Sequence, residues 1–242
     1  MMPVDSENGF LAATKSNALM SFTAPRTKND SLTFGTVAKC DDRITGMKLI
    51  APENKLIAIT SLDGSLRLLD ARQRTFAKEF SLKVGDLTAI SITPDGRRAI
   101  VGSRKGTLLV NLASGEVEKT LSATPGATAV ACGPSSEKGT FLIAIGHEDG
   151  RVLTTNGETG DVESACLLAS SGAVRYLNFS TDGYGLAAIT DKDTKLFLWD
   201  LTKAPEARKE ASSSPSFPFP FRLPGQSAKG RAFKIQNCHR QF

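Results

Sequence analysis

A four-fold internal repeat constrains the fold of this 242-residue chain more than any other feature of its sequence. A two-residue turn recurs at four places, so that its second residue is spaced by 42, 44 and 44 positions: Asp63-Gly64, Lys105-Gly106, Asp149-Gly150 and Asp193-Thr194. A nearly continuous apolar run precedes each turn, and a second strand-like run follows it. The spacing and the short runs predict an all-β fold built from one repeated sheet.

The second repeat shows how each repeat divides into strands. An alternating run over 87–92 ends at Pro94-Asp95-Gly96, where proline fixes one φ angle and glycine supplies a positive one. Apolar runs over 99–102 and 107–111 follow, and a last run over 116–121 has charges at every other position, as in an outer strand with one face in water. The inner runs lack this alternation, which predicts that both of their faces are buried. A period of 40 to 45 residues of short strands is typical of propeller blades, so we predict a β-propeller of four-stranded antiparallel blades.

The repeats divide the chain into three parts, 1–43, 44–202 and 203–242. Residues 44–202 hold the four full repeats, with boundaries at 44–86, 87–126, 127–172 and 173–202. We predict that residues 1–43 form a partial blade, because they match the second, third and fourth strands of a repeat and lack a first strand. Three explanations remain open. The chain is a part of a larger propeller, or a segment such as 231–236 folds back as the missing strand of a five-bladed ring, or a partner completes the sheet.

These residues resemble the WD-repeat family of β-propellers over about two-thirds of the chain, roughly 44–202. Trp199-Asp200 closes a third strand as in that family, and the other repeats have Leu69-Asp70, Val110-Asn111 and Thr155-Asn156 at this position. The Gly-His pair of the family is missing. The resemblance implies only fragments of the family's buried network of a histidine, a strand hydroxyl, the turn aspartate and the tryptophan. It also implies a scaffold for protein–protein interactions and no catalysis.

Charge is concentrated at the C-terminal end. Residues 1–202 have a net charge of −1, whereas residues 203–242 have +6. This tail begins with a linker rich in Pro and Ser, and its Phe217-Pro-Phe-Pro-Phe stretch either packs back on the propeller or is a linear motif for a partner. Basic residues interleaved with phenylalanines, among them Arg222, Arg231 and Lys234, suggest RNA binding by charge and stacking as an alternative function, that of a ribonucleoprotein or ribosome-biogenesis factor.

The sequence shows little that points to catalysis. His147-Glu148-Asp149 combines groups of metal-ligand type, but we interpret it as a solvated turn, because adjacent residues on a tight turn do not easily converge on one ion. The four cysteines form no CxxC pair, which favours free thiols in a reducing compartment. We expect no metal, no cofactor and no small-molecule substrate. A transmembrane run and a secretory signal are also missing, so we expect an intracellular protein, cytoplasmic or nuclear, without membrane contact.

Propeller geometry indicates where partners bind. The turns before each third strand gather at one rim, and we expect this rim to present a mixed-charge set of side chains: Asp63, Arg104, Lys105, Glu148, Asp149, Lys192 and Asp193. Mixed charge suits a protein surface better than a phosphate backbone, which requires mostly Lys and Arg. The predicted function is therefore a non-catalytic scaffold within a larger complex of proteins.

Overall fold

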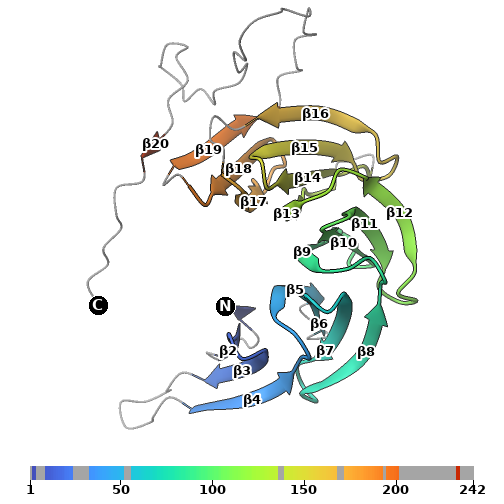
Figure 1. Ribbon diagram of the computed structural model, residues 1–242, viewed down its shortest axis with the longest axis vertical. Helices are drawn as coiled ribbons and strands as arrows, with labels where there is room; N and C mark the ends of the chain where they lie inside the picture. The colour runs from blue at the N-terminus through green and yellow to red at the C-terminus, as the bar shows by residue number, and fades with distance from the viewer. Residues whose placement is uncertain are drawn as a thin grey trace, which may run out of the picture. The chain divides into compact units, whose positions relative to one another are not determined.

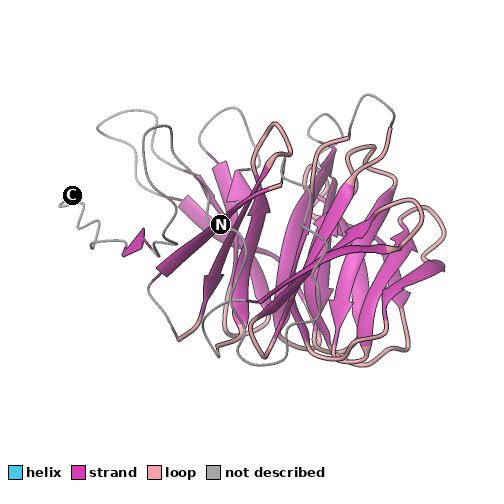
Figure 2. Ribbon diagram, turned by 90° about the horizontal axis from the view of Figure 1, so that it is seen from above, coloured by secondary structure: helices cyan, strands magenta, loops and turns pink. Residues whose placement is uncertain are grey.

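The computed structural model of the protein describes residues 2–3, 9–23, 33–51, 56–135, 139–167, 172–192, 195–201 and 233–234. Within these ranges the chain is all-β and has no helix, as Figures 1 and 2 show. Twenty strands form five four-stranded sheets, and every pair of neighbouring strands is antiparallel. The prediction of an all-β fold made of repeated antiparallel sheets is confirmed.

Strands follow one another across each sheet in the order of the sequence. Sheet 1 consists of β1 (Met2–Pro3), β2 (Gly9–Ala13), β3 (Ala18–Thr23) and β4 (Thr33–Lys39). Sheet 2 consists of β5 (Ile44–Ala51), β6 (Leu56–Ser61), β7 (Ser65–Asp70) and β8 (Thr75–Ser81). Sheet 3 consists of β9 (Leu87–Ile92), β10 (Arg98–Ser103), β11 (Gly106–Asn111) and β12 (Val117–Ser122).

The two remaining sheets have the same plan. Sheet 4 consists of β13 (Ala127–Cys132), β14 (Leu142–His147), β15 (Arg151–Asn156) and β16 (Val162–Leu167). Sheet 5 consists of β17 (Val174–Phe179), β18 (Gly185–Thr190), β19 (Lys195–Asp200) and β20 (Phe233–Lys234). The chain falls into two units, Met1–Pro125 with sheets 1 to 3 and Gly126–Phe242 with sheets 4 and 5.

Successive sheets within a unit meet through their first strands. In the first unit β5 packs against β9, and in the second unit β13 packs against β17. A hydrogen bond also joins β13 to β17: the hydroxyl of Thr128 donates to the carbonyl oxygen of Val174 at 2.6 Å.

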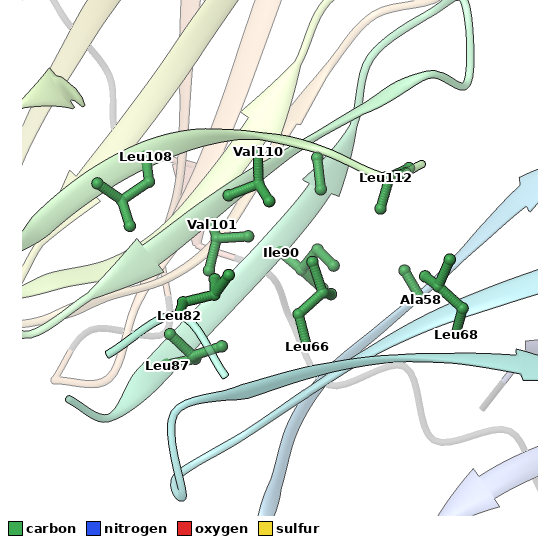
Figure 3. Close-up of a cluster of buried hydrophobic side chains, with 11 residues drawn as sticks. Ala58, Leu66, Leu68, Leu82, Leu87, Ile90, Val101, Leu108, Val110 and Leu112 are labelled. Carbon is green, nitrogen blue, oxygen red and sulfur yellow. The ribbon is translucent and has the colours of Figure 1, made fainter. Parts of the chain in front are cut away.

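In sheets 2, 3 and 4 the second strands carry the core because both of their faces are covered. All residues of β6 after Leu56 are buried, and the same holds for β10 after Arg98 and for β14 after Leu142. Figure 3 shows the cluster between sheets 2 and 3, in which Leu66 from β7 and Ile90 from β9 point toward each other. The outer strand β8 is by contrast mostly exposed. In these three sheets burial follows the strand's place in the sheet, as the lack of alternation predicted. In sheet 5 this prediction is wrong, because buried and partly exposed residues alternate along β18.

Sheets 4 and 5 share a second core. Trp199 on β19 belongs to it and is buried, as predicted from its place in the last repeat. The Trp199 ring lies 6.3 Å from the ring of Phe197, centroid to centroid, and the two are stacked.

The last residue of the third strand has the same task in three sheets. Oδ1 of Asp70 accepts hydrogen bonds from the backbone N–H groups of Arg72 and Gln73, at 2.8 and 3.0 Å. Asn111 and Asn156 accept from the residues two and three positions later in the same way. This side-chain oxygen shapes the turn into the fourth strand. Because both Asp and Asn have this side-chain oxygen, either amino acid can occupy the position.

Both ends of the strand order differ from expectation. The prediction that the first blade lacks a first strand is wrong, because Met2 and Pro3 pair with Leu11 and Phe10 as β1. Near the C-terminus, Phe233–Lys234 does add a strand, but it lies beside β19 in sheet 5 and not in sheet 1. Most of the linker and tail, with Arg222 and Arg231, lies outside the described residues.

Candidate functional site

The turn between β6 and β7 is built around one carboxylate. Asp63 Oδ1 accepts hydrogen bonds from the hydroxyl of Ser61, at 2.6 Å, and from the backbone N–H of Ser65, at 2.8 Å. Gly64 has a φ of +81°, a conformation that glycine adopts without strain. The predicted Asp-Gly turn is therefore present, and its aspartate is a structural acceptor of hydrogen bonds.

A buried arginine extends this turn into a cluster of charges. Arg67 on β7 is only 2% exposed. Its Nη1 donates to Ser61 Oγ at 2.7 Å and to Asp63 Oδ2 at 2.9 Å. Its Nη2 lies 3.1 Å from Asp41 Oδ2 and 2.7 Å from Glu79 Oε1. We call these five residues the Arg67 cluster.

The Arg67 cluster joins parts of two sheets of the first unit. Asp41 follows β4 of sheet 1, whereas Asp63 and Glu79 belong to the β6–β7 turn and β8 of sheet 2. The guanidinium carbon of Arg67 also lies 5.9 Å from the centroid of the Phe76 ring, which adds a cation–π contact. One side chain thus connects the end of one sheet to three strands or turns of the next.

Electrostatics favour the charged forms of Asp63 and Arg67. Burial opposes the ionisation of Asp63, but hydrogen bonds from Ser61, Ser65 and Arg67 outweigh it, so the pKa of Asp63 lies below its ordinary value. For Arg67, burial lowers the pKa, but the Asp63 and Glu79 carboxylates raise it by more, so the net shift is upward. When all are ionised, three carboxylates surround one cation, and the cluster has a net charge of −2.

A cysteine lies next to the cluster. Cys40 is buried at the end of sheet 1, and burial raises the pKa of its thiol, an effect that the nearby Arg67 charge opposes. Cys40 and Cys132 are free thiols, as predicted for these two.

An arginine in the middle of the third strand is specific to sheet 2. The third residue of the third strand is apolar in every other sheet: Met20, Leu108, Leu153 and Phe197. Arg67, Asp41 and Glu79 are not predictable as a group from local sequence patterns. The available signal was a single basic residue inside an otherwise apolar run, LRLLD, but its partners lie 26 residues before it and 12 after it.

The predicted rim residues of the first unit lie at the turns before the third strands. Asp63 belongs to the Arg67 cluster. Arg104 and Lys105 form the β10–β11 turn, where Arg104 Nε lies 2.8 Å from a carboxylate oxygen of Asp86 and the Lys105 N–H donates to Ser103 Oγ. The Arg104 side chain remains 71% exposed. Acidic and basic turns thus occur in one unit.

In the second unit, Glu148 and Asp149 form the β14–β15 turn. Asp149 accepts a hydrogen bond from the backbone N–H of Arg151 and pairs with its guanidinium at 2.6 Å. Partial burial opposes ionisation, but these bonds outweigh it and lower the pKa of Asp149. Lys192 is exposed after β18, whereas Asp193 lies outside the described residues. For Lys234 the structure gives only the backbone pairing with Lys195.

His147 requires a correction. We interpreted the triplet at 147–149 as a solvated turn, but His147 is the last residue of β14 and is only 1% exposed. It occupies the place that Ser61 has in β6, so its side chain points into the sheet packing and not into water. Among the described residues, no group of three or more His, Cys, Asp or Glu side chains is placed to hold a metal ion.

The described part of the chain has no helix that is long and apolar enough to cross a membrane. No known protein family matches the sequence, and no curated protein is significantly similar to it.

Proposed function

We propose that this chain is a divergent WD-repeat-like β-propeller that acts as a non-catalytic platform for other proteins. The Ser61–Asp63–Arg67 arrangement is the observation that supports the class most directly. It joins a strand hydroxyl, a turn aspartate and a cation in one partly buried network, with arginine as the cation where the family has histidine. The repeated Asp or Asn cap at the end of the third strand is a second point of similarity.

The way the turns are held supports the platform role. Their carboxylates accept backbone and side-chain hydrogen bonds, so charged groups are presented in fixed positions. Pre-ordered side chains lose little conformational entropy when a partner binds. Acidic groups at the Arg67 cluster and the exposed basic side chain of Arg104 then offer complementary contacts to a mixed-charge protein surface.

The hydrogen bonds at these turns also argue against a general-acid role for the two aspartates. Asp63 and Asp149 have lowered pKa values, so both are ionised near neutral pH. A carboxylate that acts as a general acid instead needs a raised pKa. We therefore assign these aspartates to turn structure and partner contact.

Affinity purification with matched charge reversals tests the platform. The rim variant is Arg104→Glu, and the control is Arg97→Glu in the β9–β10 turn at the opposite end of sheet 3. After nuclease treatment, we expect stoichiometric partners to remain with the wild type and the control and to fall about tenfold with the rim variant. Equal recovery with both variants would contradict the rim assignment. Complete loss on nuclease treatment would favour the RNA-bound alternative.

A further inference from the structure

Sheet 5 has one covered face and one open face within the second unit. Leu186, Ala188 and Trp199 point to the core shared with sheet 4. Strand side chains alternate between faces, and directly paired residues share a face. The register therefore places the following residues on the opposite face, which we call the open face: Tyr176, Asn178, Ala187, Ile189, Leu196 and Leu198.

The corresponding positions of earlier sheets are buried. In sheet 2, Ala58, Leu66 and Leu68 are at most 5% exposed, because sheet 3 covers them. In sheet 5 the residues of the open face are partly or fully exposed, and Tyr176 is 62% exposed. A contiguous apolar surface of this kind is typical of a binding site.

The side chains of the open face do not suit another sheet. In sheet 4, the first and second strands pair Ala129 with Gly146, and a Cβ added at Gly146 would lie 2.6 Å from Val174 of sheet 5. Close packing of sheets thus depends on small residues at this point. At the corresponding positions of sheet 5, Tyr176 is paired with Ile189. These larger side chains would prevent another sheet from packing equally closely.

We propose that the open face binds residues 217–221 of the same chain, the Phe-Pro-Phe-Pro-Phe stretch. Both ends of the connection that contains this stretch are attached to sheet 5. Leu201 packs against the shared core and its N–H donates to the carbonyl of Tyr184 at 2.7 Å. Phe233 pairs with Leu196 on the outer edge of β19.

Length and tethering favour this occupant over a separate molecule. The connection has 31 residues, 202–232, and an extended chain spans about 3.3 Å per residue. The three full strands of sheet 5 are together only about 10 Å wide, at roughly 4.8 Å between strands. The stretch is thus within reach of the whole open face, at an effective concentration on the order of millimolar.

The chemistry of the stretch also fits. Proline has no backbone N–H, so this stretch is a poor addition to a sheet edge and is suited to lie across side chains. Extended proline-rich peptides bind surfaces that present aromatic side chains, as Tyr176 does here. Its three phenylalanines would cover the apolar surface of Ile189 and Leu198 that is exposed to water.

Site-specific photocrosslinking of the full-length chain tests this inference, which is independent of the platform function. The variant is Tyr176→p-benzoylphenylalanine, with Asn178 on the same strand as a second position. The control is the same substitution at Tyr184, which is 61% exposed on the β17–β18 turn. We expect crosslinks from positions 176 and 178 to residues 217–221 within one chain, and few from position 184.

A change in the stretch itself completes the test. Replacing Phe217, Phe219 and Phe221 by Ser should lower the crosslink yield about tenfold, because the apolar contact is lost. Crosslinks between two chains would instead identify a second copy as the occupant. That result would overturn the proposal, as would crosslinks to other segments or an unchanged yield after the serine substitutions.

Discussion

Arg67 Nη1 lies 2.9 Å from Asp63 Oδ2, so a buried guanidinium completes a turn that a carboxylate begins. The pair is four residues apart along one hairpin, yet Arg67 also reaches Asp41 from sheet 1. This arginine therefore contributes both to the local turn and to the contact between sheets.

Replacing Arg67 should show how much the cluster stabilises the fold. We expect Arg67→Ala to lower the free energy of unfolding by about 3 to 5 kcal/mol, because it leaves a cavity and an unpaired, partly buried carboxylate. Arg67→Met should cost less, since methionine fills the space and the equivalent position of sheet 1 is Met20. Urea denaturation measures both variants. Equal costs for Ala and Met would mean that side-chain volume contributes little.

Acid should weaken the Asp63 turn. The pKa of Asp63 is lower in the folded chain than the unfolded value of about 3.9, so its stabilisation is fully present above that value. The contribution is lost as pH falls through the folded pKa. We expect the stability difference between wild type and Asp63→Asn to be largest above pH 5 or so and to shrink toward pH 3. A constant difference in urea midpoints over this range would contradict the prediction.

Arg74 and Gly115 form a matched pair for a backbone test. Each follows the Asp or Asn cap by four residues, and their φ angles are +58° and +78°. Arg74→Gly should be neutral or stabilise by up to about 1 kcal/mol, because a left-handed arginine is strained. Gly115→Ala should destabilise, since the added Cβ would overlap the ring of Phe80. Thermal melts measure both, and a stabilising Gly115→Ala would contradict the assigned turn.

Trp199 tests the core of the second unit. Trp199→Ala should cost about 3 to 5 kcal/mol, because the side chain is buried between sheets 4 and 5. Tyr184→Ala is the control, since this large aromatic residue is mostly exposed and should change stability by less than about 0.5 kcal/mol. Circular dichroism melts report both changes. Similar melting temperatures for the two variants would argue against the position of β19.

Local signals predicted the strands and several turns. The Pro94-Asp95-Gly96 and Asp149-Gly150 turns have glycines at φ angles of +69° and +85°. These features depend on neighbouring residues, so the sequence pattern contains them. Trp199 was also placed correctly, because a large apolar residue at the end of an inner strand is rarely exposed.

Features that depend on distant residues could not be predicted in this way. His147 was misjudged because its neighbours Glu148 and Asp149 are polar, whereas its burial comes from its strand position. The Arg67 cluster depends on a partner 26 residues away in another sheet. Similarly, β1 and β20 are two-residue strands, too short to produce a periodic pattern.

The cap at the end of the third strand separates charge from shape. Asp70 and Asn111 hold the same turn through the same Oδ1 atom, although one side chain is anionic and the other neutral. Replacing one of these amino acids by the other therefore changes the net charge at that end of the sheet by one unit, with almost no change in backbone geometry. Each repeat can in this way carry a different charge at this end of its sheet while the fold stays the same.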